Sequence, residues 1–489
     1  MTRSINWFPW CQDTFVKSSD ENKPILMYLT ARWCGWCAVM EDTTYQDPQV
    51  IDLVEENYIP MKVNVDQYPH VADRYHFGGY PSVVFLSSDG QILQGENYLS
   101  GDQMKSVLEE VLKKSNRQSS MVRRLKSESY GNGKNKLKQK SSEQTNVVLP
   151  SICEINKIIA NSFDQKYGGF FIYSPDTKFP FPEIHDYLFS YVQFNSACPE
   201  EEMLKTTLDA MLKGELYDHS LGGFFRFCEN RDWTLPHSEK LLDNNAALAR
   251  NYLTALDKFG LEEYRVAARD TINYLVFDFF DQETQVFAGS RIGKEIDATP
   301  YTNWNSTAIS SLLIAYQVLD HRFYLETALK VIESLWARCY RLGRGMSHFY
   351  LNGPSEVELL SDQIKYISAL YDAYLCTEGK TYLHRARLLM RHMEKNYRMP
   401  EGNFSDIPVS EKRPGYLSIP LVPFMENVDV ALLFIKFARL FGSGAYIQKA
   451  EEILRSLSGM IMDNPIFAAK YGQGLLEMEH YRVKNQSFS

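Results

Sequence analysis

The chain has 489 residues, enough for two or three domains, and its 44% hydrophobic and 23% charged residues are typical of a globular protein. The net charge of −9 at pH 7 argues against nucleic acid as a partner. A run of about 18 apolar residues, which a membrane-spanning helix needs, does not occur. The first residues, Met1–Trp7, lack the apolar segment of a secretory signal.

Eight cysteines are present, and only Cys34 and Cys37 stand close together in the sequence. Single, scattered cysteines are typical of small apolar side chains in a reducing compartment. We therefore expect a cytoplasmic protein that needs neither a membrane nor a nucleic acid as partner.

The pair lies between a predicted strand and a predicted helix. Pro24–Leu29 is an apolar run that predicts a buried strand, and Ala38–Glu41 begins a helical pattern. A cysteine at a helix N-terminus faces unpaired N–H groups and the positive end of the helix dipole, which favour the thiolate. Cys34 is thus the expected attacking thiolate, and Cys37 the thiol that resolves a mixed disulfide.

A C-x-x-C sequence also supplies two ligands of a zinc site. Such a site needs two further ligands, and neither a second C-x-x-C nor a close pair of histidines follows. The sequence therefore favours a redox dithiol, and we expect no metal and no cofactor.

The flanking sequence predicts the rest of a small α/β domain. Further strands are expected at Met61–Asp66, after the turn that ends in Pro81, and at Gln91–Leu93. Amphipathic helices are expected at Gln12–Ser19, Val50–Asn57 and Asp102–Lys114.

This arrangement resembles a thioredoxin-like domain. The resemblance implies that Pro81 has a cis peptide bond and faces the dithiol, with Trp33 and Trp36 shielding it. Thioredoxins usually carry a buried Asp six residues before the first cysteine, whereas this chain has Tyr28 there. Glu41 or a water is the expected substitute for that proton acceptor.

We divide the chain at 115 and 147. Residues 1–115 form the thioredoxin-like domain, residues 116–147 a basic linker, and residues 148–489 a second domain. The linker is rich in Lys, Arg, Ser, Asn and Gln, so it cannot bury a core and is expected to be disordered. A tether is favoured over a patch for nucleic acid or anionic lipid, because aromatic residues that could stack on bases are almost absent.

The second domain is predicted to be helical and repetitive. Pairs of amphipathic helices alternate with short turns, about 54 to 63 residues apart, a period typical of helical-hairpin repeats. Six such units can close into an (α/α)6 toroid with its funnel at the loops and inner-helix N-termini. The turns are at Tyr167–Phe170, Leu221–Phe224, Val286–Gly289, Met346–Phe349, Gly402–Phe404 and, in degenerate form, Pro465–Phe467.

The richest polar stretch follows the second turn. His237 and Glu239 are expected at the start of a helix, with Lys240 and Asn244 on one helix face. A histidine, a carboxylate and amides at one mouth could bind a sugar and move a proton, together with Arg226 and Trp233. The alternative is structural: these side chains cap the helix and brace neighbouring loops.

Other stretches are expected to converge at the same mouth. They are Asp176–Asp186, the segment Tyr301–Thr307 with Trp304 and Asn305, and Asp362. Polar and aromatic groups thus recur at similar positions in several repeats.

Over nearly its whole length the chain resembles the spermatogenesis-associated proteins, in which a thioredoxin-like domain precedes a toroid. The toroid half is similar to six-hairpin glycosidases and sugar 2-epimerases. Four positions depart from the family pattern: Gly35 replaces a histidine, Ser238 a phenylalanine, Asp243 a tyrosine, and Asn244 a carboxylate. The matching segments are Cys34–Glu41, Lys178–Pro180, Gly222–Phe224 with Arg226, Trp233–Ala246, and Trp304–Asn305.

Three functions follow from these observations. The first is a thiol–disulfide oxidoreductase whose toroid binds a protein client or a small carbohydrate-like ligand. The second is a carbohydrate-active enzyme, an epimerase or hydrolase, with a regulatory thioredoxin-like domain. Its acid–base groups would be His237 and Glu239, with Asp362 or Asp186 as a second carboxylate. The third is a non-catalytic scaffold.

Overall fold

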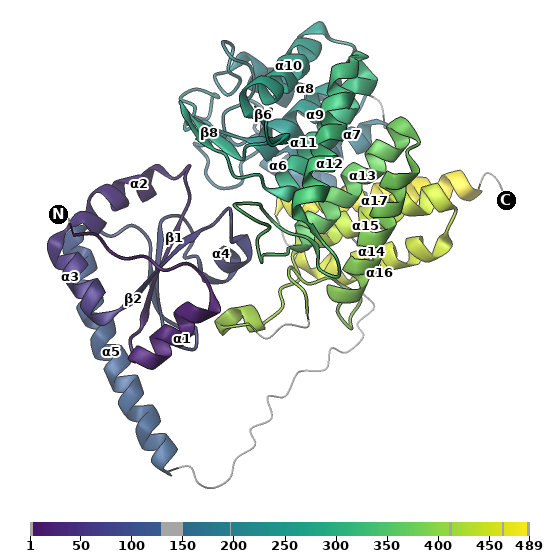
Figure 1. Ribbon diagram of the computed structural model, residues 1–489. Helices are drawn as coiled ribbons and strands as arrows, with labels where there is room; N and C mark the ends of the chain where they lie inside the picture. Colours follow the sequence, from purple (N-terminus) through teal and green to yellow (C-terminus); the bar gives the residue numbers. More distant parts are fainter. Residues whose placement is uncertain (1–2, 129–149, 196, 410–412, 462–463, 487–489) are drawn as a thin grey trace. The chain divides into compact units, whose positions relative to one another are not determined.

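A computed structural model describes residues 3–128, 150–195, 197–409, 413–461 and 464–486 (Figure 1). The chain forms two compact units, which are described separately. The first comprises residues 1–145 with 410–420, and the second comprises residues 146–409 with 421–489. The helix expected to end at Lys114 continues to Glu128, and the rest of the predicted linker up to residue 147 lies outside the described residues.

A four-stranded mixed sheet forms the centre of the first unit, in the order β2-β1-β3-β4. β1 pairs in parallel with β2 and antiparallel with β3, and β3 pairs antiparallel with β4. All six residues of β1 are buried, as its continuous apolar sequence predicts. The strands are β1 (Ile25–Thr30), β2 (Ile59–Asn64), β3 (Ser82–Leu86) and β4 (Ile92–Glu96).

Helices accompany this sheet at positions that local sequence explains. Asp47 caps one of them, because its side chain accepts from the N–H of Gln49 at 2.8 Å and Pro48 follows as the first helical residue. The helices are α1 (Gln12–Glu21), α2 (Gly35–Asp42), α3 (Pro48–Asn57), α4 (Pro69–Tyr75) and α5 (Gly101–Glu128), with the 3-10 turn η1 (Thr44–Gln46).

A segment distant in sequence completes the first unit. Arg74 donates to the carbonyl oxygens of Tyr416 at 3.1 Å and Ile419 at 2.8 Å. The N–H of Tyr416 donates to the hydroxyl of Tyr75 at 2.9 Å, and the two rings lie 5.5 Å apart. The chain therefore returns to the first unit between two helices of the second, an excursion that the sequence did not indicate.

Helices α6–α17 build the described part of the second unit. α17 packs against both α6 and α7, so the last helix meets the first ones and closes the ring. The helices are α6 (Ile152–Ser162), α7 (Pro182–Val192), α8 (Pro199–Lys213), α9 (Leu242–Phe259), α10 (Glu262–Tyr274), α11 (Thr302–Leu319), α12 (Arg322–Cys339), α13 (Leu360–Thr377), α14 (Lys380–Asn396), α15 (Phe424–Phe441), α16 (Gly444–Leu457) and α17 (Pro465–Gln486).

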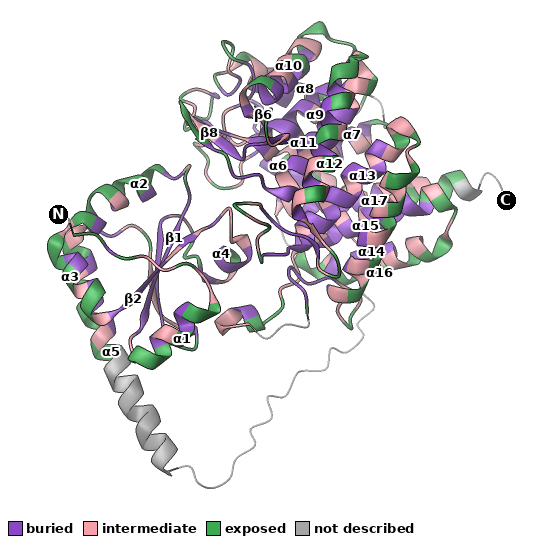
Figure 2. Cartoon of the chain, in the orientation of Figure 1, coloured by how far each residue is buried: buried purple, intermediate pink, exposed green. Residues whose placement is uncertain are grey.

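The second unit buries one continuous core. The side chains of this core are hydrophobic. Figure 2 shows buried residues along the helices in purple and exposed residues in green. None of the described helices offers a stretch long and apolar enough to cross a lipid bilayer. Short strands pair within the loops: β5 (Glu239–Leu241), β6 (Phe280–Asp281), β7 (Val286–Phe287), β8 (Ser290–Ile292), β9 (Glu295–Asp297), β10 (Tyr340–Arg341) and β11 (Gly345–Met346).

The turns between helices share one bracing device. The amide of Asn245 accepts from the N–H of Phe224 at 2.6 Å and donates to its carbonyl oxygen at 3.0 Å. Asn305 holds Phe287 in the same way, at 2.8 and 3.0 Å. Gln363 and Asn427 repeat the arrangement with Met346 and Phe404.

Two details of the sequence prediction are wrong. His237 and Glu239 do not begin a helix, because Glu239–Leu241 forms β5 and pairs with β8, so α9 starts only at Leu242. Lys240 therefore does not share a helix face with Asn244. Pro465–Phe467 is not a turn but the first turn of α17.

Candidate functional site

The two neighbouring cysteines lie at the N-terminus of α2. Cys34 is the N-cap residue with an extended backbone, and its Sγ accepts from the N–H of Cys37 at 3.1 Å. The two sulfurs form a disulfide. Cys34 is 7% exposed and Cys37 only 1%, so Cys34 is the more accessible sulfur. Within the described residues, no group of three or more His, Cys, Asp or Glu side chains is arranged to hold a metal ion.

The two tryptophans beside the dithiol differ in their surroundings. Nε1 of Trp33 donates to Asp66 at 2.9 Å, and its ring lies 5.9 Å from that of Tyr80. The peptide bond between Tyr80 and Pro81 is cis, as the resemblance to thioredoxins implies. Trp36 is 63% exposed, so it offers an apolar surface next to the disulfide instead of shielding it from solvent.

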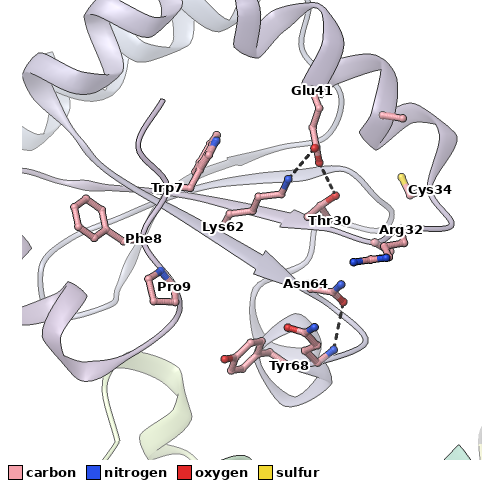
Figure 3. A pocket seen from close by; sticks show the side chains of 13 residues that line it. Trp7, Phe8, Pro9, Thr30, Arg32, Cys34, Glu41, Lys62, Asn64 and Tyr68 are labelled. Atoms are coloured by element: carbon pink, nitrogen blue, oxygen red, sulfur yellow. Dashed lines mark hydrogen bonds and ion pairs between the residues drawn. The ribbon is translucent and has the colours of Figure 1, made fainter. Parts of the chain in front are cut away.

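Cys34 also lines a cavity of about 610 Å³ (Figure 3). Inside it, Nζ of Lys62 lies 2.7 Å from a carboxylate oxygen of Glu41, whose other oxygen accepts from the hydroxyl of Thr30 at 3.2 Å. The cavity is lined by Trp7, Phe8, Pro9, Thr30, Ala31, Arg32, Cys34, Ala38, Glu41, Lys62, Asn64, Gln67 and Tyr68.

Tyr28 occupies the position at which thioredoxins carry a carboxylate. Its side chain is fully buried, and its hydroxyl donates to the carbonyl oxygen of Cys37 at 3.1 Å. Burial raises the pKa of Tyr28 well above its usual range. Tyr28 therefore keeps its proton at neutral pH, and Glu41 is the carboxylate that the cavity brings to the dithiol.

The second unit has its own cavity, a funnel of about 580 Å³. It is lined by residues of α7, α9, α11, α13, α15 and α17, which are therefore the inner helices. Glu183, Asp243, Asn303 and Ser361 lie in the first turns of four of these helices. The cavity thus includes the inner-helix N-termini, where the repeat pattern predicts a funnel, and it continues along the helices as far as Lys436 and Arg439 near the end of α15.

Of the residues singled out for this mouth, Trp304 and Asp186 line the funnel, and Arg226 acts on one of its carboxylates. Trp304, in the first turn of α11, lines the cavity. Burial raises the pKa of Asp243 to about 6, the charge of Glu183 adds to this shift, and Arg226 opposes it. Arg226 therefore lies within electrostatic reach of the carboxylates in the funnel.

His237 and Glu239 contact each other through Nδ1 and a carboxylate oxygen. The imidazole of His237 also stacks on Phe227, with ring centroids 4.5 Å apart. Glu239 is almost fully buried, and its second oxygen has no hydrogen-bond partner within the part of the chain that the structure describes. Neither residue lines the funnel cavity.

The remaining predicted residues make structural contacts. Asn305 braces the turn at Phe287, and Trp233 is buried and donates to the carbonyl oxygen of Tyr167 at 2.8 Å. Asp362 is fully buried, accepts from the N–H groups of Asn303 and Leu359, and lies 2.9 Å from Nδ1 of His348. Nδ2 of Asn244 is buried and has no partner in the described parts of the chain.

Sequence reasoning missed two buried lysines with matching roles. Nζ of Lys178 contacts Asp164 at 2.8 Å and the carbonyl oxygen of Gly168 at 2.6 Å. Nζ of Lys240 contacts Asp218 at 2.7 Å and the carbonyl oxygen of Gly222 at 2.8 Å. The signal was available, because Asp precedes the Gly-Gly-Phe turn by the same spacing in both repeats.

Glu183 lies within the Asp176–Asp186 stretch expected at this mouth, but neither it nor Asp243 was singled out as a residue of the funnel. Each is the second residue of an inner helix, and the two positions belong to successive repeats. Aligning the repeats by their turns would have placed both carboxylates at equivalent positions.

Comparison with known proteins agrees with both halves of this description. Residues 1–138 match the family model of the DsbH thioredoxin-like domain, described as "Protein of unknown function, DUF255". A thioredoxin H-type of Fagopyrum esculentum is 32% identical over 82 residues, covering 16% of this chain and 66% of the plant protein.

Similarity to one relative extends beyond this domain. Spermatogenesis-associated protein 20 of Homo sapiens is 29% identical over 306 residues. The match covers 55% of this chain but only 37% of the human protein. The chain therefore spans little more than a third of that relative's length.

The helical unit has a likeness among solved structures. Cellobiose 2-epimerase from Bacillus thermoamylovorans superposes with a TM-score of 0.57 at 11% identity, covering 67% of this chain and 98% of the epimerase. At this identity the likeness shows the fold alone. The predicted fold class is confirmed: a thioredoxin-like region precedes an (α/α)6 toroid of the six-hairpin kind, and the chain resembles the spermatogenesis-associated proteins in sequence.

Proposed function

We propose that the chain is a thiol–disulfide oxidoreductase that uses Cys34 and Cys37. The observation that carries the proposal is the disulfide at the N-terminus of α2. The cis bond before Pro81 in the same unit supports it. The N–H groups of the first helical turn and the helix dipole favour negative charge on the sulfur of Cys34. Exposed Trp36 supports a protein as the client, because it offers apolar surface beside the disulfide.

The proposed reaction conserves atoms and electrons. In the reduced protein the Cys34 thiolate attacks one sulfur of a client disulfide, forming a mixed disulfide and releasing a client thiolate. Cys37 loses its proton and attacks the Cys34 sulfur, which leaves Cys34–Cys37 oxidised and the client fully reduced. A low-molecular-weight thiol such as glutathione returns the protein to the dithiol, and the reverse sequence oxidises a client dithiol.

Glu41 supports this chemistry as the acceptor of the Cys37 proton, directly or through a water in the cavity. It faces the cavity that Cys34 lines, and Thr30 and Lys62 hold its two oxygens. Tyr28 is unsuited to the role because it keeps its proton. Lys62 places a positive charge in the same cavity, which further favours a thiolate.

A cytoplasmic location is part of the proposal. The other six cysteines are free, which is typical of a reducing compartment. In this proposal the toroid binds the client or a small ligand, and it need not use His237 and Glu239, which do not line the funnel.

The test is a redox titration of the full chain, followed by the mass shift on thiol alkylation across a glutathione series. A two-electron transition between about −120 and −270 mV is expected, the span of thioredoxin-like enzymes. Cys34→Ser and Cys37→Ser should abolish it, whereas Cys11→Ser, which removes a free cysteine of the same unit, should retain it. If no transition occurs, the oxidoreductase proposal fails and a scaffold role is favoured.

A further inference from the structure

The funnel of the second unit contributes no residue to the dithiol chemistry, yet its lining is strongly polar. Among the described residues it contains seven carboxylates and five cations, contributed by five of the six inner helices, whereas α11 contributes neutral residues. The carboxylates are Glu183, Asp186, Asp243, Asp372, Glu426, Asp429 and Glu477, and the cations are Arg250, Lys365, Lys436, Arg439 and Lys470.

Each cation that lines the funnel already has a carboxylate partner. Lys365 and Lys470 both contact Asp429, Lys365 at 2.8 Å. Arg250 pairs with Asp186, Lys436 with Asp372 and Arg439 with Glu477. A phosphate or carboxylate ligand would have to compete with these carboxylates for the cations. The funnel is therefore suited to a neutral ligand.

Neutral hydrogen-bonding groups are interleaved with these pairs. Asn303, Ser361 and Ser368 line the cavity, together with the indole of Trp304. Oε1 of Gln473 also lines it, is buried, and has no hydrogen-bond partner within the described ranges. A buried acceptor of this kind is costly unless a donor reaches it. A hydroxyl of a bound ligand would be such a donor.

Glu183 and Asp243 are the carboxylates at the mouth that have no cation partner among the described residues. They are the second residues of α7 and α9, which are neighbouring inner helices. One oxygen of Asp243 accepts from the N–H of Asn244 at 2.7 Å. Because no cation binds them, both carboxylates are available to hydroxyl groups of a ligand.

The electrostatic setting of these two groups also favours proton exchange with a ligand. Burial raises the pKa of Glu183, and the nearby charge of Asp186 adds to the rise while Lys470 and Lys365 oppose it. The pKa of Asp243 is raised to about 6 by burial, to which Glu183 adds. Two neighbouring carboxylates with raised pKa values can exchange protons with a ligand as an acid and a base at one site.

We propose that the funnel is a second binding site, specific for a neutral saccharide, in which Glu183 and Asp243 contact the sugar hydroxyls. The face of Trp304 packs against the ring carbons, and Gln473 accepts from a hydroxyl deeper in the cavity. The ion pairs around the wall make the site selective for neutral sugars over their phosphates and uronic acids.

The test measures binding to the full chain by calorimetry and thermal shift, with glucose, mannose, cellobiose and maltose as probes. At least one neutral sugar should bind, and Glu183→Gln and Asp243→Asn should each weaken its affinity at least tenfold. Glucose 6-phosphate and glucuronate should bind at least tenfold more weakly than the neutral sugar.

Glu200→Gln is the matched control. Glu200 also follows a proline at the start of a helix, but α8 does not line the funnel, so this variant should bind like the unaltered chain. Cys34→Ser should also bind normally, which separates this proposal from the dithiol reaction. The proposal is wrong if no neutral sugar binds, if the charged sugars bind more tightly, or if Glu183→Gln and Glu200→Gln behave alike.

Discussion

The hydroxyl of Tyr28 donates a hydrogen bond to the backbone carbonyl oxygen of Cys37, at 3.1 Å. A tyrosine at this position ties the first turn of α2 to the central sheet, where a carboxylate would instead exchange protons with the dithiol. Positioning the helix and exchanging protons with the dithiol are thus assigned to two different residues, where a single buried carboxylate would do both. Tyr28 positions the helix, and Glu41 faces the cavity beside Cys34.

Replacing Tyr28 by Phe should lower stability without altering the titration of the dithiol. The variant leaves the carbonyl oxygen of Cys37 without this donor, at a cost of about 1 kcal/mol in the free energy of unfolding. Tyr58→Phe is the matched control, since Tyr58 is equally buried and donates to the carbonyl oxygen of Leu108 at 2.6 Å. Urea denaturation should give similar losses for both. A shifted pH profile of thiol alkylation in Tyr28→Phe would contradict the structural role.

Glu41→Gln and Lys62→Met should change the reactivity of Cys34 in opposite directions. Glu41 places a negative charge in the cavity that Cys34 lines, and Lys62 a positive one. Removing the negative charge favours the thiolate and should speed alkylation of the reduced protein at pH 7 by about twofold, and removing the positive charge should slow it similarly. Both effects should shrink in 1 M salt, where charges are screened beyond about 3 Å. Equal changes in the same direction would refute this account of the cavity.

Lys178→Met should strongly destabilise the helical unit. Lys178 and Asp164 form an ion pair with both side chains fully buried, and Arg231 contacts the same carboxylate. Removing one partner of a buried pair typically costs about 3 to 5 kcal/mol, and here the remaining contact with Arg231 should keep the loss near the lower end. Circular dichroism during urea denaturation measures it, with the exposed pair Lys213–Asp209 as the control. Lys213→Met should leave the midpoint of the urea transition unchanged.

His185 should make the helical unit less stable as pH falls from about 6.5 to 4. The imidazole is fully buried against Asn251, and burial lowers its pKa to about 4, whereas in the unfolded chain it titrates near 6.5. Between these values the unfolded state binds the additional proton, so about 3 kcal/mol of stability is present above pH 6.5 and lost toward pH 4.

Denaturation midpoints across this pH range test the assignment to His185. His185→Gln should flatten the dependence, and His219→Gln, which alters an exposed histidine of the same unit, should leave it unchanged. If stability still falls with pH in His185→Gln, the proton binds to another group.

Below pH 4 a further loss of stability is expected from Asp218. Lys240 and neighbouring donors lower the pKa of Asp218 to about 2, against the effect of its own burial. The stability that the ionised Asp218 contributes is fully present above about pH 3.9 and is lost as its carboxyl group protonates at lower pH.

Gly90→Ala should weaken the packing of residues 413–420 in the first unit. A Cβ at Gly90 would lie 2.7 Å from the Cα of Gly415, and its φ of +83° disfavours any side chain. Gly78 has a nearly identical φ of +84° with nothing within 4 Å of the added atom, so Gly78→Ala isolates the backbone strain. The first variant should be less stable than the second by about 1 to 3 kcal/mol, the usual effect of overpacking. Equal stabilities would show that Gly415 moves away at no cost.

Features of the structure that depend only on residues close together in the sequence could be predicted from it. The apolar run of β1, the C-x-x-C at a helix start and the turn before Pro81 are local signals, and each lies where expected. The repeated Gly-Gly-Phe turns marked the period of the toroid. In the second turn, Gly222 and Gly223 have φ near +77° and +76°, which a residue with a side chain rarely adopts.

Pairing between distant segments decided what the sequence left open. Glu239–Leu241 became a strand because it pairs with Ser290–Ile292, about fifty residues further on, which moved Glu239 away from the funnel. The amide of Asn305 likewise hydrogen-bonds to the backbone of Phe287, in the turn before its own helix. It therefore braces that turn instead of binding a ligand.

The sequence by itself determined the two folds and the position of the dithiol, because strand periodicity, helix starts and repeat spacing are encoded within short windows. Only the tertiary structure decided which polar residues face the funnel. Glu183 and Asp243 have no distinctive motif, and they come together because ring closure brings the inner-helix N-termini to one mouth. The same long-range packing placed Lys62 of β2 in the cavity that Cys34 lines, whereas Glu41, on the helix that Cys34 caps, was already expected near the dithiol.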